Sequence, residues 1–194
     1  MLTRESLLYA SYIGISIAQW QPMIRHHFTV DVEEYFHVSA FESAVPRTDW
    51  DRFELRTPVC LPRLLGILER HEARGTFFVL GWMAERLPQL IKDISLAGHE
   101  IASHGWDHKK VTAQSSSQFR ESVRRTKRRL EDLTGTQVVG FRAPSFSIVP
   151  GLEWALDILI EEGYAYDSSL FPIRRPDGYG YPAARRGQIG RAHV

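Results

Sequence analysis

Short apolar segments alternate with longer amphipathic ones along most of this chain. Gly75–Leu80 (GTFFVL) is rich in β-branched and aromatic residues, which is typical of a buried strand. Ser115–Leu133 has apolar residues at helical spacing, and Gly135 follows it where a helix stop is expected. In the same way the sequence predicts strands at Phe28–Val32, Glu100–Ser103, Val138–Phe141 and Tyr164–Tyr166, and helices at Pro58–His71, Trp82–Leu96 (with a second segment from Pro88) and Leu152–Glu162.

Strands and helices in strict alternation imply parallel strands joined by right-handed helical crossovers. The predicted fold class is therefore α/β, with a doubly wound sheet and a β/α barrel as the two architectures that the pattern allows. A length of 194 residues suits one domain with a sizeable core.

Composition excludes several classes of function. The net charge of +1 gives no reason to expect nucleic acid or an anionic membrane as the main partner. Cys60 is the single cysteine, which rules out an internal disulfide and a thiolate metal cluster. Any metal in this chain would have to be held by imidazole and carboxylate groups.

The two ends of the chain lack the alternating pattern. Residues 1–25 are an N-terminal extension whose apolar run, Leu7–Ala18, is shorter than the roughly 20 residues of a membrane-spanning helix. We expect no stable membrane span and a cytoplasmic location, or a periplasmic or secreted one if residues 1–18 act as a signal. Residues 181–194 lose all periodicity, and the last six are what a common sequencing adapter would encode, so we expect a non-native tail.

Polar residues gather at the carboxyl ends of the predicted strands. Asp31 and Glu33 follow the first strand, His104 the third, Arg142 the fourth, and Asp167 the fifth. In parallel β/α folds these strand ends share one rim, and that rim is where sites are built. The sequence therefore predicts a reaction centre at this rim.

His104 and His108 (HGWDH) are four residues apart. On a helical turn both imidazoles would face the same way and could reach one metal ion. Two imidazoles and a carboxylate from another strand, with a position left open for water, form a catalytic zinc arrangement. We expect Asp107, between the two histidines, to orient a neighbour or to face solvent.

The predicted helix at Ser115–Leu133 also carries a basic run, RRTKRR, at residues 124–129. The run lies on the polar side of the helix and is interleaved with acidic residues such as Glu121 and Glu131. We therefore interpret it as a solvated outer face and not as a phosphate-binding surface.

The stretch GTFFVLGWMAERLPQLIKDISLAGHEIASHGWDH (75–108), followed by FRAPSFS (141–147), resembles the NodB-type polysaccharide deacetylases of carbohydrate esterase family 4. Within them the chain is most similar to the subgroup associated with bacterial exopolysaccharide loci, from DVEEYFHVSAFE (31–42) to YDSSLFPIR (166–174). The resemblance implies that residues 26–180 form a distorted, incomplete β/α barrel. It also implies a divalent metal, expected to be zinc, and an acetylated polysaccharide or oligosaccharide as the substrate.

The resemblance also implies roles for single residues. Asp31 matches the general base, Arg142 the arginine that pairs with and orients it, and Ser145 the position where a backbone N–H faces the developing oxyanion. His104 and His108 match the metal histidines.

The third metal ligand is matched to the family less directly than the two histidines are. Family members usually place the metal-binding aspartate directly after the base, where this chain has Val32. Members with an Asp-x-Asp opening place it one residue later, which favours Glu33, with Glu34 as the alternative.

Four further residues are predicted to bind substrate. Pro144 belongs to the family's Arg-x-Pro motif, and Asp167 lies at the fifth strand end. Trp106 and Tyr35 are the aromatic residues near the rim that we expect to stack on sugar rings.

One family motif has no match. The Leu-x-His that supplies the acid for the leaving amine is not found after Asp167, so we expect the last barrel strands to be missing from a C-terminally truncated chain. Two other interpretations stay open: a hydrolase of another non-peptide C–N amide bond on the same fold, and an inactive metal- or glycan-binding fragment.

Overall fold

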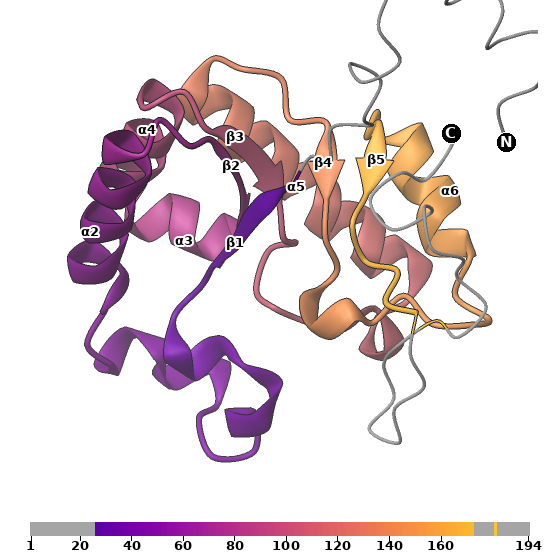
Figure 1. The fold of residues 1–194 in the computed structure, drawn as a ribbon. Helices are drawn as coiled ribbons and strands as arrows, with labels where there is room; N and C mark the ends of the chain where they lie inside the picture. The colour runs from indigo at the N-terminus through magenta and orange to yellow at the C-terminus, as the bar shows by residue number, and fades with distance from the viewer. Residues whose placement is uncertain (1–25, 173–180, 182–194) are drawn as a thin grey trace, which may run out of the picture.

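The computed structural model describes residues 26–172 and Tyr181. The predicted N-terminal extension and the predicted tail lie outside these residues, except for Tyr181. The described part contains a parallel sheet in the order β1-β2-β3-β4-β5, flanked by helices (Figure 1), so the α/β fold class is confirmed. The strands are β1 (Phe28–Val32), β2 (Gly75–Val79), β3 (Glu100–Ser103), β4 (Gly140–Phe141) and β5 (Tyr166–Asp167).

The helices fall where the apolar spacing predicts them, and each connects consecutive strands. They are α2 (Thr57–Arg70), α3 (Gly81–Arg86), α4 (Pro88–Leu96), α5 (Ser116–Thr134) and α6 (Trp154–Glu161). No helix in the described part of the chain is long and apolar enough to cross a membrane.

Local signals explain most of the helix boundaries. Pro88 begins α4, as predicted, because proline is suited to the first helical turn. Ser115 caps α5 in a capping box with Gln118, and Gly135 ends α5 in a left-handed conformation with φ of 66°. By contrast, β5 begins two residues later than predicted, because the Tyr164 N–H still bonds to a carbonyl of the last turn of α6.

The sheet is strongly curved, and one side chain shows it. Two strands lie between β4 and β1 in the sheet, so a flat sheet would place them about 14 Å apart. Nevertheless, Arg142 at the end of β4 donates to Thr29 Oγ1 (3.1 Å) and to Asp31 Oδ1 (2.8 Å) on β1. The curvature therefore carries residues from distant strands toward one another across the inner face of the sheet.

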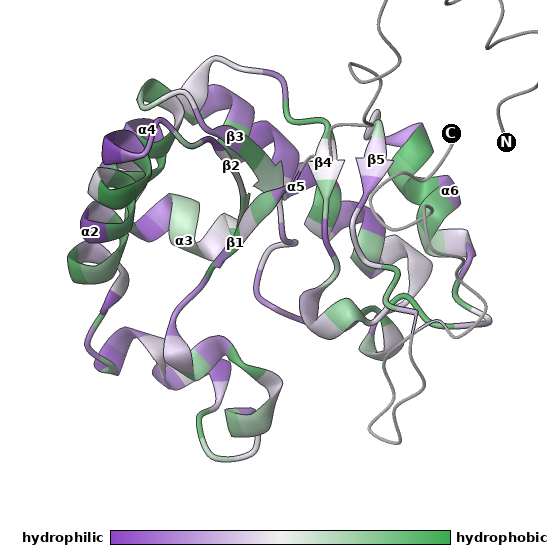
Figure 2. Cartoon of the chain, viewed as in Figure 1, coloured by the Kyte–Doolittle hydropathy of each residue, from purple (hydrophilic) through white to green (hydrophobic). Residues whose placement is uncertain are grey.

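The core lies between the other face of the sheet and the helices, and Figure 2 shows hydrophobic residues on the strands and on much of α6. Its largest fully buried members include Phe77, Phe119, Phe141, Ile91 and Leu130.

The basic run on α5 is not only a solvated face, and that prediction was wrong in part. The run instead holds neighbouring elements to α5. Lys127 Nζ donates to the carbonyls of Val138 and Gly163, both at 2.8 Å. Arg124 pairs with Glu162 at the end of α6 (2.7 Å). The acceptors come from segments remote in sequence, so the helical pattern alone could not reveal them.

Residues 33–56, which we name the β1–α2 segment, leave the carboxyl end of β1 and form short 3-10 turns at Tyr35–His37, Ser39–Phe41 and Arg47–Arg52. In Figure 1 the segment lies beyond the carboxyl ends of the strands. It therefore forms a wall beside the rim where the reaction centre is predicted.

Candidate active site

Glu33, His104 and His108 each bring one possible ligand atom to within 4.8 Å of the others. Glu33 Oε2 lies 3.0 Å from His108 Nε2, yet this buried oxygen makes no hydrogen bond within the described structure. A buried acceptor without a partner is costly, and an ion would complete it. Two ligands of a tetrahedral zinc are separated by about 3.3 Å, so the donor set fits a divalent metal.

His104 is held in the tautomer that a metal requires. Its Nδ1 lies 2.8 Å from the carbonyl oxygen of Arg142. A carbonyl only accepts, so Nδ1 carries the proton and the Nε2 lone pair is left for a metal. Burial is the largest influence on the pKa of His104 and lowers it, while the carboxylates of Asp31 and Glu33 act in the opposite direction.

His108 reaches the same place without the predicted helical turn. Residues 104–110 form a loop in which Gly105 has φ of 77° and His108 has φ of 54°. A left-handed conformation is uncommon for a non-glycine residue and recurs at functional sites. The prediction of a helical turn was wrong, because the reversal at Gly105 takes the chain out of helical geometry. The two imidazole rings nevertheless lie 5.4 Å apart.

Glu34 is engaged elsewhere. Its two carboxylate oxygens accept hydrogen bonds from the backbone N–H groups of Arg56 (3.0 Å) and Thr57 (2.9 Å), at the beginning of α2. The residue is only 2% exposed. Because both oxygens are used to cap a helix, Glu34 does not compete with Glu33 for a metal in this arrangement.

Asp31 forms an ion pair with Arg142, whose Nη1 is 2.8 Å from Asp31 Oδ1. The guanidinium also donates to Thr29 Oγ1 and Ser168 Oγ (2.9 Å) and lies over the Phe78 ring at 4.0 Å. These contacts fix the direction of the arginine. The Asp31 side chain stays 29% exposed, so the carboxylate is both oriented and reachable.

Asp167 does not face a substrate, contrary to prediction. It is 3% exposed and accepts hydrogen bonds from the backbone N–H and the hydroxyl of Ser169. Burial raises the pKa of Asp167 to about 6, although the Ser169 bonds and the charge of Arg142 act against the rise. Ser169 Oγ in turn accepts from the Ala143 N–H (2.7 Å), so Asp167 supports the strand ends of β4 and β5.

Ser145 lies in a strained turn after β4. It has φ of 55°, and Phe146, next to it, has φ of 50°. The Ser145 hydroxyl is 2.9 Å from the hydroxyl of Ser39 in the β1–α2 segment. Pro144 is buried at the first position of this turn, so it fixes the backbone. Its burial does not fit the predicted contact with substrate.

The two predicted sugar-stacking residues differ in their surroundings. The Arg125 guanidinium lies 3.3 Å from the centroid of the Trp106 ring. A Cβ atom on Gly81 would come within 2.3 Å of that ring, so the indole packs between α3 and the Arg125 side chain of α5. Trp106 stays partly exposed and lines a pocket, so its contact with a sugar stays a prediction. Tyr35 is 37% exposed, carries the Arg56 guanidinium at 4.4 Å from its ring, and lines a pocket of about 290 Å³ between β1 and α2. The wall of this pocket does not include His104, His108 or Arg142.

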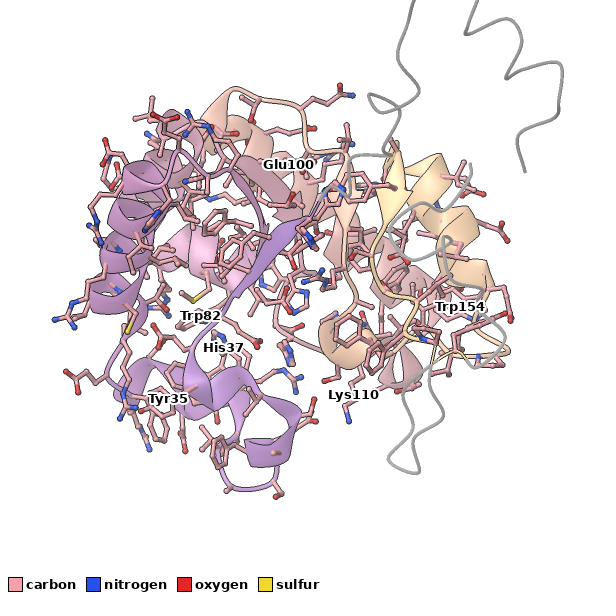
Figure 3. The ribbon with its side chains drawn as sticks, in the orientation of Figure 1. Tyr35, His37, Trp82, Glu100, Lys110 and Trp154 are labelled. Atoms are coloured by element: carbon pink, nitrogen blue, oxygen red, sulfur yellow. The ribbon has the colours of Figure 1, made fainter. Side chains whose placement is uncertain are left out.

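Sequence reasoning missed His37. Its Nδ1 accepts from the Glu34 N–H (3.0 Å), and its ring is almost fully buried beside Trp82 (Figure 3). Burial is the main cause that lowers the pKa of His37 to about 3, and the neighbouring His108, His104 and Arg47 also disfavour a positive charge on this ring. The three-residue spacing of Glu34 and His37 is that of a capping box, and this was the available signal.

Arg47 was missed as well. Its Nε is 3.2 Å from Asp107 Oδ2, and its Nη1 is 3.0 Å from Glu42. The first contact ties the β1–α2 segment to the loop that carries His104 and His108. Asp107 therefore orients the neighbouring Arg47 side chain, which agrees with one of its two predicted roles.

Comparison with known proteins agrees with this geometry. A sequence model of the family described as polysaccharide deacetylase matches residues 50–155. The chain is 31% identical over 105 residues to the peptidoglycan-N-acetylglucosamine deacetylase PgdA of Listeria monocytogenes, covering 50% of this chain and 22% of that protein. It is also similar to a solved structure from Mycobacterium smegmatis that is assigned to the polysaccharide deacetylases, with 34% identity and a TM-score of 0.64.

A third similarity concerns the fold alone. A CE4 family pseudoenzyme from Bacillus anthracis has a TM-score of 0.56 at 23% identity, over 73% of this chain and 41% of that one. The M. smegmatis match covers 75% of this chain and 50% of its counterpart, so the chain spans half or less of each of these relatives.

The family match takes in the loop with His104 and His108 and the strand end with Arg142, and it extends over more than half of the chain. The strands and helices in that range are those that position the two histidines and the arginine beside Glu33 and Asp31. This chain belongs to the polysaccharide deacetylase family.

Proposed function

We propose that this domain is a metal-dependent deacetylase, which hydrolyses N-acetyl groups of an acetylated polysaccharide and releases acetate. One observation carries the proposal: the donor set of Glu33, His104 and His108 lies beside the Asp31–Arg142 ion pair. Hydrolysis of an amide needs a polarised carbonyl and a base for the attacking water, and the two groups of residues are suited to these separate tasks.

Zinc is the metal that we propose, since two imidazole nitrogens and one carboxylate with an open position form a catalytic zinc donor set. When bound, the ion supplies Lewis acidity that polarises a carbonyl and makes a water molecule more acidic. Glu33, His104 and His108 would hold it. The Arg142 carbonyl that fixes the His104 tautomer supports this assignment.

In the reaction, Asp31 accepts the proton of the attacking water. The positive charge of Arg142 stabilises the carboxylate form of Asp31 and fixes its orientation. The backbone N–H of Ser145 donates to the carbonyl oxygen as negative charge develops there. The left-handed backbone at Ser145 supports this role, because strain of this kind is retained where geometry matters.

The substrate that we propose is a polymer of N-acetylated hexosamine, in particular an exopolysaccharide. The Listeria relative is named for N-acetylglucosamine deacetylation of peptidoglycan, which supports the sugar. The sequence DVEEYFHVSAFE at residues 31–42 and its resemblance to the exopolysaccharide-associated subgroup support the polymer.

The test is acetate release from zinc-loaded protein. Tetra-N-acetylchitotetraose, poly-N-acetylglucosamine and peptidoglycan are compared, with Asp31→Asn as the control that should be inactive. Acetate from the glycans, fastest from poly-N-acetylglucosamine, would support the proposal. Turnover of a cyclic amide such as hydantoin without acetate release would instead favour another C–N hydrolase, and zinc binding with no turnover at all would favour a binding module.

A further inference from the structure

A second pocket lies beside the candidate metal centre, on the side of the β1–α2 segment. Its volume is about 230 Å³, smaller than the 300–1,000 Å³ that is typical of pockets for drug-sized molecules. It is therefore suited to one monosaccharide-sized group. His108 forms part of its wall, so the pocket adjoins the proposed metal. The lining residues that matter below are Phe36, His37, Ser39, Arg47, Trp50 and His108.

Two N–H groups at this pocket have no acceptor in the described structure. His37 Nε2 and Trp50 Nε1 are both buried and unpartnered. Because His37 Nδ1 accepts from a backbone N–H, the ring proton is on Nε2, and an indole nitrogen can only donate. Both residues are 4% exposed, and their rings are 4.3 Å apart.

A buried donor that is left without a partner costs free energy, so each such group calls for an explanation. Two donors side by side at one pocket indicate an occupant that supplies acceptor oxygens. The almost fully buried rings of Phe36 and Trp50, whose centroids are 6.1 Å apart, add an apolar part to the wall.

The charges around the pocket define the type of acceptor. Arg47 is paired with Glu42 (3.0 Å) and with Asp107 (3.2 Å), so its charge is already balanced. The His37 ring is neutral. The pocket is therefore suited to hydroxyl or carbonyl oxygens and less to a carboxylate.

We infer that this pocket is a sugar-binding subsite, in which His37 Nε2–H and Trp50 Nε1–H donate to oxygens of the hexosamine unit next to the acetamide that is hydrolysed. The inference rests on the proposed deacetylase function and adds the residues that hold the glycan. Ser39, on the wall of the same pocket, shares a hydrogen bond with Ser145, and this bond connects the subsite to the predicted oxyanion position.

Two substitutions remove the donors with little other change. His37→Asn keeps a side-chain acceptor close to the position of Nδ1 but removes Nε2–H, and Trp50→Phe keeps an aromatic ring but removes the indole N–H. His99→Asn is a matched control, since His99 is also buried and its Nδ1 accepts the Gly75 N–H. Trp154→Phe is the second control, because Trp154 packs on Phe119 and lies far from His37 in Figure 3.

The measurement is binding of tetra-N-acetylchitotetraose to the zinc-loaded full chain by calorimetry. We expect each donor variant to bind about tenfold more weakly, which is the size of one or two net hydrogen bonds, while the controls stay within about twofold. Zinc stoichiometry and thermal melting are recorded for each variant. Where acetate release is seen, KM should rise with kcat little changed, because the subsite binds ground state and transition state alike.

A second readout is made on the wild-type chain, and Trp50→Phe serves only to assign the resonance. With the indole groups labelled with ¹⁵N, the resonance that is missing in Trp50→Phe should shift in the wild-type chain when the tetrasaccharide is added. Unchanged affinity in both donor variants, or no tetrasaccharide binding and no shift in the wild type, would overturn the subsite even if acetate is released. Binding and shift without acetate release would leave the subsite standing and count against the deacetylase function.

Discussion

Asp31 on β1 and Glu33, the first residue after β1, have opposite surroundings. On the histidine side of the site, Glu33 faces His104 and His108 and has a buried oxygen without a hydrogen-bond partner. On the arginine side, Asp31 pairs with Arg142, which also donates to a threonine and a serine. The chemical role of each carboxylate therefore follows from its neighbours and not from its residue type.

The two sides also differ in whether they need a bound ion. The histidine side offers a set of acceptors that an ion would complete, whereas the arginine side is held together by bonds within the protein. Loss of the metal should therefore affect the histidine side and leave the arginine side in place. Four experiments test this separation.

The largest effect is expected for His108→Ala. Removing a ligand should weaken zinc binding by more than about 100-fold, because removing a residue that only supports a ligand already weakens metal binding by up to about 100-fold. Acetate release should fall to background. Competition with a chelator measures the affinity. His71→Ala, at the exposed end of α2, is the control. Retention of one zinc per chain in His108→Ala would show that the histidine side is not the metal site.

On the arginine side, Asp31→Asn should leave zinc affinity within about threefold and reduce turnover by about 10²- to 10⁴-fold, because it removes the base and no ligand. Zinc content and kcat are measured on the same sample. Simultaneous loss of metal would break the comparison, since Asp31 would then act as a ligand.

Asp167, which supports the arginine side, gives a pH test. Its pKa is about 6 in the folded chain against an ordinary value of 3.8, so between pH 4 and pH 6 the unfolded chain loses this proton first. Folding stability from this group is thus greatest below pH 4 and is lost as pH rises to 6, by about 3 kcal/mol in total. Urea unfolding at several pH values should show this fall, and Asp167→Asn should flatten it. An equally steep fall in the variant would assign the effect to another group.

The smallest effect is expected for the third carboxylate, Glu34, which belongs to neither side. Glu34→Gln weakens the cap of α2 and should lower the free energy of unfolding by about 1–2 kcal/mol, with zinc affinity unchanged. Urea unfolding and zinc titration measure the two quantities. Weaker zinc binding with unchanged stability would reverse the assignment of Glu33 and Glu34.

The sequence predicted much of this fold because the elements follow local signals. Ser115, Gly135 and Pro88 mark helix ends by their own chemistry, and β1 and β2 show apolar runs. Parallel topology then places the strand-end residues, including Asp31 and Arg142, on one rim. The rest depends on contacts between remote segments, which local patterns do not contain.

Trp106 and Glu34 show how such contacts decide a role. The Trp106 ring packs between Gly81 and the Arg125 side chain, two neighbours that are remote in sequence. Glu34 is excluded as a ligand because the beginning of α2 reaches its carboxylate. His108 is a third case, since its left-handed backbone follows from the loop as a whole.

The Arg142–Asp31 ion pair joins residues 111 positions apart in the chain, whereas Glu33, His104 and His108 are all present once residue 108 has been made. Synthesis proceeds from the N-terminus, and early parts of a domain gather before late ones. The nascent chain thus contains the three proposed zinc ligands before it contains Arg142, whose side chain orients Asp31 and whose carbonyl fixes the His104 tautomer. On the proposed function, the order of synthesis therefore supplies the metal ligands before it supplies the partner of the base.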